Sequence, residues 1–273
     1  MTLRTALIQT RTPATHAAAL DHVLPLVAEA AAGGASLIAT PEGTNILQRR
    51  KAELLPQLRL LADDPVVQGL QAAAKDLGVW ILLGSALVLR KDGKAANRCA
   101  LIAPGGEITA TYDKLHMFDV DLPTGETVRE SETYEPGARA VIAQADGVSL
   151  GLTICYDVRF PALYRALAVA GAQVLTVPAA FTRPTGEAHW EILLRARAIE
   201  TGSFVLAPAQ GGVHEDGRGT WGRSIAIAPW GEVLGKLDHD EPGVLFADLD
   251  LEAVAKARGA IPALKNARAF AAP

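Results

Sequence analysis

Residues 151–161 read GLTICYDVRFP, and this stretch decides how the surrounding chain folds. The apolar run that leads into Cys155 is typical of a strand buried inside a sheet. The residues that follow, RFPALYRALAVAGA, predict a helix with Pro161 near its start. Cys155 is therefore expected where a strand gives way to a helix, which is where open α/β sheets place their sites.

Cys155 by itself supports two interpretations. A free cysteine is a common residue of hydrophobic cores, so this one could simply fill space. A thiol just before a helix N-terminus could also serve as a nucleophile, because the helix dipole there favours the thiolate. The chain contains only two cysteines, and the other, Cys99, shows no metal-ligand spacing to Cys155.

The length, net charge and hydropathy of the chain favour a large α/β domain of a cytoplasmic protein. Its 273 residues carry a net charge of −4 without a basic block, which gives no reason to expect a nucleic-acid partner. The start, MTLRTALIQTRTP, has too short an apolar run for a signal peptide. Nor does any apolar stretch reach the roughly 18 residues of a membrane span.

The pattern of apolar and turn residues predicts a series of strands and helices. Strands are expected at residues 2–10, 36–40, 78–90, 97–104 and 105–114, and helices at 15–32, 48–61 and 65–77. The turn at KDGK predicts antiparallel pairing for the later strands. Residues 116–137 are polar and lack periodicity, which predicts a long functional or mobile loop.

The second half of the sequence repeats features of the first. GASLIATPEG at 34–43 is similar to GAQVLTVPAA at 171–180. DGKAANRCALIAPGGEI at 92–108 is likewise similar to DGRGTWGRSIAIAPWGEV at 216–233. Two echoes in the same order predict duplicated halves that pack sheet on sheet with helices outside.

Two charged residues join Cys155 at the ends of predicted strands. Glu42 follows a strand in ATPEGTN, and Lys114 follows another in TYDKLHMF. Each taken alone could be an ordinary loop or surface residue. Together the three suit covalent acyl transfer: a carboxylate takes the proton of a thiol, whose ordinary pKa is ~8.5, and an ammonium stabilises the oxyanion.

These motifs resemble the nitrilase superfamily of carbon–nitrogen hydrolases. The resemblance rests on PEG at Glu42, YDKLHMFDVD at Lys114 and GLTICYDVRFP at Cys155. TGEAHWEILLRARAIET at 185–201 and WGRSIAIAPWGEV at 221–233 extend it. It implies one domain over residues 1–273, folded as a four-layer αββα sandwich with internally duplicated halves.

The resemblance also implies the residues that act. Cys155 would be the nucleophile, Glu42 the general base and Lys114 the oxyanion ligand, together with the backbone N–H of Tyr156. No metal or organic cofactor would be needed. A second glutamate is expected after the lysine; Glu130 fits better than Glu126 because of its RES…PG context.

The substrate would be a small amide that carries a carboxylate. RESETYEPG at 129–137 and APAQGGVHEDGR at 207–218 resemble the branch that hydrolyses deaminated glutathione, a metabolite-repair reaction. The alternatives are an omega-amidase acting on α-ketoglutaramate, a carbamoylase or other hydrolase, and a non-catalytic scaffold. Arg159 is the expected carboxylate ligand, with Phe181 and Thr185 beside it. A homodimer is expected, with helix 187–201 and the C-terminal tail as candidate interface.

Overall fold

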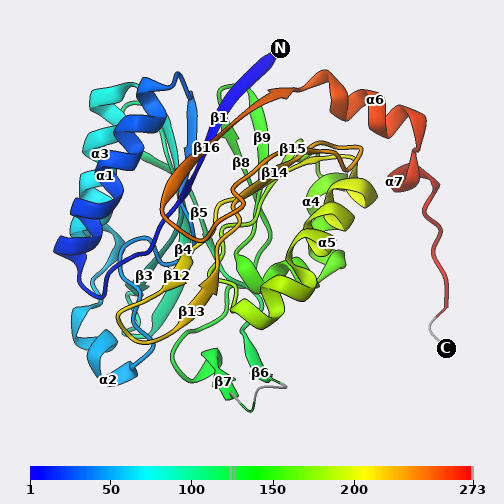
Figure 1. The fold of residues 1–273 in the computed structure, drawn as a ribbon. Coiled ribbons are helices and arrows are strands. Elements are labelled where there is room, and N and C mark those ends of the chain that lie inside the picture. The colour runs from blue at the N-terminus through cyan, green and yellow to red at the C-terminus, as the bar shows by residue number, and fades with distance from the viewer. Residues whose placement is uncertain (123–124, 126, 272–273) are drawn as a thin grey trace.

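Two six-stranded sheets face each other in the centre of the molecule, with helices on both outer faces (Figure 1). We describe them from a computed structural model that places residues 1–122, 125 and 127–271. The largest group of buried hydrophobic side chains fills the space between the two sheets, with Leu7 and Leu82 from one and Leu150 and Val205 from the other. A second group lies between the first sheet and its helices.

The first sheet has the strand order β16-β1-β2-β3-β4-β5. The first three strands in the chain run parallel to one another, and the other three are antiparallel to their neighbours. The bounds are β1 Thr2–Gln9, β2 Leu37–Ala39, β3 Trp80–Leu89, β4 Ala95–Ile102, β5 Ile108–Asp113 and β16 Gly243–Asp250.

The second sheet has the order β15-β14-β11-β10-β9-β8. The bounds are β8 Val141–Ala145, β9 Val148–Leu152, β10 Val174–Thr176, β11 Phe204–Ala207, β14 Ile225–Ile227 and β15 Val233–Lys236. Its pattern of parallel and antiparallel pairs repeats that of the first sheet strand for strand. The echoed segments coincide with β2 and β10, and with β4–β5 and β14–β15. The predicted duplication and αββα sandwich are thereby confirmed.

Helices α1 and α3 cover the first sheet, and α4 and α5 cover the second (Figure 1). The bounds are α1 His16–Ala32, α2 Lys51–Leu54, α3 Pro65–Leu77, α4 Pro161–Val169, α5 Arg183–Thr201, α6 Glu252–Ala260 and α7 Ala263–Asn266. The predicted helix at 65–77 is confirmed because Asp64 caps it, accepting the N–H groups of Val66 and Val67 at 2.9 and 3.1 Å. None of the helices among the described residues is long and apolar enough to cross a bilayer.

The predicted helix at 48–61 is wrong. Only α2 and short 3-10 turns form there. The chain just before it is held open because Asn45 binds the backbone of β3: its Nδ2 donates to the Leu87 carbonyl at 2.9 Å, and its Oδ1 accepts the Leu87 N–H at 2.8 Å. Pro56 then lies in a 3-10 turn, where it removes a backbone donor. Tertiary hydrogen bonds override the helical pattern.

Two short hairpins lie at the edge of the sheets. β6 (Asp119–Asp121) and β7 (Thr127–Arg129) pair within the stretch predicted to be a loop. β12 (Gly211–Val213) and β13 (Gly219–Trp221) form the second hairpin. Both pairs are only three residues long, too short for periodicity to reveal.

Candidate active site

Cys155 opens a short 3-10 helix, Cys155–Arg159, and is separated from the end of β9 by two residues. Its φ of +48° lies in the left-handed region, which a non-glycine residue rarely adopts. Its N–H donates to the Pro178 carbonyl at 2.9 Å, and the residue is 8% exposed. A backbone held in this region costs about 1–3 kcal/mol, and such strain clusters at functional sites. The expected position between strand and helix is confirmed.

The ammonium of Lys114 lies between two carboxylates. Its Nζ is 3.0 Å from Glu42 Oε1, and 2.9 and 2.8 Å from the two oxygens of Glu130. Lys114 follows β5 directly, and its side chain is 2% exposed. All three of its N–H donors therefore have acceptors, which fixes the position of the charge.

Glu42 is hydrogen-bonded to residues from both halves of the molecule. Its Oε2 accepts the N–H of Ala180 at 2.8 Å, from the loop after β10. Its Oε1 also accepts from Asn97 Nδ2 at 2.8 Å, and the carboxylate lies beside the Cys155 thiol, whose pKa it raises. The predicted trio of Glu42, Lys114 and Cys155 is therefore brought together in space.

Asn97 is a member of the site that the sequence analysis missed. It is 3% exposed within β4 and reaches both Glu42 and, at 3.5 Å, Glu130 Oε1. Its signal in the sequence is a polar amide inside an apolar strand, ANRCALI, which requires buried partners.

The environment keeps the thiol neutral and the carboxylate charged. Burial and the neighbouring Glu42 carboxylate raise the pKa of the Cys155 thiol well above its ordinary value. Burial also raises the pKa of Glu42, but the Lys114 charge and the hydrogen bonds to the carboxylate outweigh it and lower that pKa overall. Burial lowers the pKa of Lys114, and the two carboxylates more than reverse this, raising it well above the ordinary value. Burial beside a carboxylate disfavours a second negative charge, and here this outweighs any preference for the thiolate at the helix start.

One buried carboxylate ties the segment before Cys155 to the segment after Lys114. Asp157 Oδ2 accepts the Ile154 N–H at 2.9 Å and the Tyr112 hydroxyl at 2.7 Å. Its Oδ1 accepts the His116 N–H at 3.1 Å and lies 2.7 Å from His116 Nδ1. Asp157 therefore couples the positions of the thiol and the ammonium. His116, to which we assign no chemistry, also stacks on Phe160 with ring centroids 3.5 Å apart.

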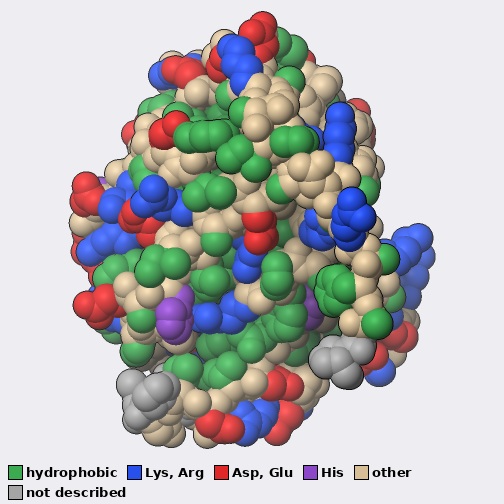
Figure 2. Space-filling view, turned by 90° about the vertical axis from the view of Figure 1, so that its right-hand side faces the viewer, with side chains coloured by type: hydrophobic (Ala, Val, Ile, Leu, Met, Phe, Trp, Pro, Cys, Tyr) green, Lys and Arg blue, Asp and Glu red, His purple; other side chains and the backbone are tan. Residues whose placement is uncertain are grey.

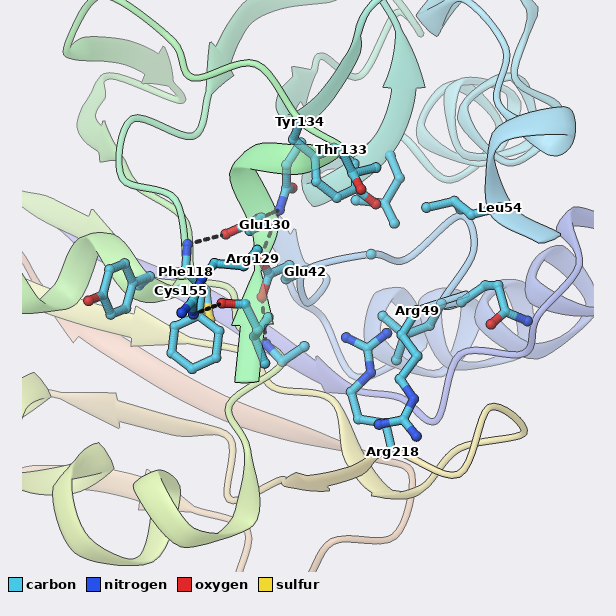
Figure 3. A pocket seen from close by; sticks show the side chains of 18 of the residues that line it. Glu42, Arg49, Leu54, Phe118, Arg129, Glu130, Thr133, Tyr134, Cys155 and Arg218 are labelled. Atoms are coloured by element: carbon cyan, nitrogen blue, oxygen red, sulfur yellow. Dashed lines mark hydrogen bonds between the residues drawn. The ribbon is translucent and has the colours of Figure 1, made fainter. Parts of the chain in front are cut away.

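A cavity of about 510 Å³ opens onto this cluster (Figure 3). That volume suits a small-molecule ligand. Of the predicted site residues, Glu42, Lys114, Glu130, Cys155, Tyr156, Phe181 and Thr185 line it. Glu126 lies outside the described residues, so the choice between it and Glu130 stays a prediction, although Glu130 does bind the Lys114 ammonium.

Arg159 is not among the residues that line the cavity. Its guanidinium carbon lies 5.9 Å from the ring centroid of Tyr156 and 5.4 Å from that of Phe181, both of which do line it. Its Nη2 is 3.3 Å from His189 Nδ1. Arg183 and Pro184, between the predicted pocket residues Phe181 and Thr185, begin helix α5.

This fold and this cluster define a class of proteins: αββα hydrolases with a cysteine, a lysine and a glutamate at the junction of duplicated halves. The sequence matches the description "Carbon-nitrogen hydrolase" over residues 4–259, so the chain belongs to the carbon–nitrogen hydrolase family, and the predicted resemblance is confirmed.

Relatives with known names agree with this assignment. The chain is 40% identical to a deaminated glutathione amidase from Yersinia enterocolitica over 86% of this chain and 82% of that one. It is 35% identical to an omega-amidase from Bos taurus over 98% and 95%, respectively. Each match covers more than two thirds of the relative's length.

Solved structures share the fold. The C. elegans NitFhit protein is 31% identical with a TM-score of 0.91; the match covers 98% of this chain but only 65% of that longer one. An amidase mutant from Nesterenkonia sp. AN1 is 28% identical with a TM-score of 0.80, covering 97% and 94%. That structure carries the acetamide moiety of fluoroacetamide on its active-site cysteine.

Proposed function

We propose that the chain is an amidase that cleaves a small, carboxylate-bearing amide through a thioester on Cys155. The observation that carries this proposal is the contact of the Cys155 thiol with the ionised Glu42 carboxylate, beside the Lys114 ammonium, at the wall of the cavity. A neutral thiol next to a charged carboxylate is the starting state that general-base catalysis requires.

In the first step Glu42 takes the thiol proton while the Cys155 sulfur forms a bond to the amide carbon. The carbonyl oxygen becomes an oxyanion, which the Lys114 ammonium and the Tyr156 backbone N–H stabilise. Glu42 then passes its proton to the leaving nitrogen, the carbon–nitrogen bond breaks, and the acyl group remains on sulfur as a thioester.

Water completes the cycle in the second half of the reaction. Glu42 takes a proton from a water molecule, whose oxygen attacks the thioester carbon. The carbon–sulfur bond breaks, the carboxylic acid leaves, and the thiolate recovers its proton from Glu42. Asn97 and Glu130 act as positioning residues, since they hold Glu42 and Lys114.

We assign deaminated glutathione as the substrate. The two segments that resemble this branch, 129–137 and 207–218, contribute Glu130, Thr133, Tyr134 and Arg218 to the cavity wall. The released acyl part would be α-ketoglutarate. Its distal carboxylate would bind Arg159, which lies against the rings of Tyr156 and Phe181; those two residues and Thr185 line the cavity. An omega-amidase acting on α-ketoglutaramate is the second candidate, because omega-amidase relatives align over 98% of the chain.

A side-by-side rate comparison tests the assignment. We expect kcat/KM for deaminated glutathione to exceed that for α-ketoglutaramate by more than roughly tenfold, equivalent to about 1.4 kcal/mol of transition-state binding. The reverse preference would make the protein an omega-amidase. Turnover of neither amide would refute the proposed substrates. Carbamoylase activity would be recognised by carbon dioxide release.

The homodimer expected from the sequence has a candidate face on the second half of the molecule. Ile192 and Ile199 of α5 are 70% and 56% exposed, and Trp230 and Ile261 nearby are 54% and 60% exposed. This side faces the viewer in Figure 2, where hydrophobic side chains gather between charged ones. Light scattering should give twice the chain mass of 28.6 kDa, and Ile192→Arg should reduce it to the single chain. A monomeric unmodified chain would contradict the dimer.

A further inference from the structure

The cavity wall carries a marked excess of positive charge beyond the catalytic cluster. Besides Glu42, Lys114 and Glu130, its charged lining residues in the described part of the chain are Arg49, Arg50, Lys51, Arg129, Arg218 and Glu132. Five of these six are basic. An anionic ligand, or an anionic part of one, is the chemistry that such a wall attracts.

Some of these charges already have acidic or carbonyl partners. Arg50 Nη1 is 2.9 Å from Glu53, and Arg129 Nη2 is 2.8 Å from Asp121. Lys51 donates to the Glu132 carbonyl at 2.7 Å. These three groups are exposed and contribute chiefly to the overall positive electrostatic potential of the cavity wall.

Arg218 is held differently. It lies just before β13 in a hairpin whose buried Asp216, 4% exposed, anchors it twice: Oδ1 accepts the Arg218 N–H at 2.9 Å and Oδ2 accepts Nη2 at 3.1 Å. Asp216 Oδ2 also accepts the Arg49 N–H at 2.8 Å, so the two arginines are neighbours. The Arg218 side chain is 25% exposed, and its buried Nε has no hydrogen-bond partner among the described residues.

The positions of Arg218 and Arg49 relative to Cys155 indicate which part of a bound substrate they would contact. Figure 3 shows the Arg218 and Arg49 side chains on the Glu42 side of the cavity, away from Cys155. The hairpin that carries Arg218 is joined to Glu42, because Gln210 Nε2 donates to the Glu42 carbonyl at 3.0 Å. Glu42 is the group that would hand its proton to the leaving nitrogen. The leaving part of the substrate therefore extends toward Arg218.

We propose that Arg218, anchored by Asp216 and next to Arg49, binds a carboxylate on the leaving amine of the substrate. This inference rests on the proposed amidase function and specifies it further: the preferred substrates are N-substituted amides whose released amine carries a carboxylate, as a dipeptide does. The guanidinium pairs with the carboxylate in bidentate fashion. Ammonia as a leaving group has no such carboxylate, so an unsubstituted amide forgoes this contact.

The test compares two substrates that differ only in that carboxylate: deaminated glutathione and the same compound with its terminal glycine as the carboxamide. The measured quantity is the ratio of their kcat/KM values in the wild type, Arg218→Gln, Arg218→Lys and Arg139→Gln. Arg139 is exposed and outside the cavity lining, which makes it the matched control. α-Ketoglutaramate is assayed in parallel.

We expect the wild type to prefer the carboxylate, and Arg218→Gln to lower the ratio by about 10- to 100-fold, mainly through KM. Arg218→Lys keeps the charge but not the planar guanidinium, so its kcat/KM ratio should fall less than that of Arg218→Gln. The ratio of Arg139→Gln should match that of the wild type. With Cys155→Ala enzyme, calorimetry should show the same loss in affinity for uncleaved deaminated glutathione when Arg218→Gln is added.

Three results would count against the inference. An unchanged ratio in Arg218→Gln, or equal losses on both substrates, would mean that Arg218 serves only the structure of the hairpin. Turnover of α-ketoglutaramate alone by the wild type would overturn the leaving-group site and leave the amidase chemistry standing. Failure to cleave any of the three amides would instead refute the proposed function itself, and with it this site.

Discussion

Replacing Cys155 by alanine is expected to reduce amide turnover by roughly 10,000-fold or more, because without a nucleophile no thioester forms. The variant should still fold. The substitution removes one sulfur atom from a residue that is 8% exposed and keeps a Cβ at the same backbone position. Steady-state kinetics on deaminated glutathione, paired with thermal unfolding of both proteins, measures the two effects separately.

Cys99 supplies the matched control. It is fully buried in β4, where burial raises the pKa of its thiol and keeps it unreactive. Cys99→Ala should keep kcat within about threefold of the wild type and lose some stability, since it leaves a small void in the core. Iodoacetamide should label the wild type and Cys99→Ala once, and Cys155→Ala not at all. Turnover that survives in Cys155→Ala would rule out the thioester route.

Much of this site could be predicted because its chemistry sits where the local sequence pattern is strongest. Cys155, Glu42 and Lys114 each follow an apolar strand, and the duplicated topology brings the ends of those strands together. The spatial meeting of the three was inferred from their type and from the family resemblance. The distances that make them one site depend on how the two sheets face each other, which no local pattern contains.

The misses have a common cause, which is partnering between segments distant in the chain. Residues 48–61 carry a helical pattern, but Asn45, just before them, binds β3 42 residues away and holds the chain open. Asn97 reaches Glu42 across 55 residues, and its role becomes visible only when both strands are in place. The helix start after Cys155 favours its thiolate, but burial and the Glu42 carboxylate, which comes from a distant part of the chain, raise the pKa of the thiol.

Replacing Glu42 by glutamine should abolish hydrolysis while leaving the cysteine reactive. Glutamine has nearly the same shape, but it can neither take the thiol proton nor return it to the leaving nitrogen, so kcat should fall by roughly 1,000-fold or more. The thiol should nevertheless ionise more readily. The Glu42 carboxylate is one of the causes that raise the pKa of Cys155, and the substitution removes that charge while Lys114 remains.

Two pH profiles check this prediction. In the wild type, kcat/KM should require ionised Glu42. Because the pKa of Glu42 is lowered, activity should fall on the acid side only below the ordinary glutamate pKa of about 4.3. In Glu42→Gln, alkylation by iodoacetamide should titrate at lower pH than in the wild type, although amide turnover is lost. The exposed Glu107→Gln should leave both profiles unchanged. An alkylation profile that moves to higher pH in Glu42→Gln would contradict the electrostatic argument, and retained turnover would remove Glu42 from the proton transfers.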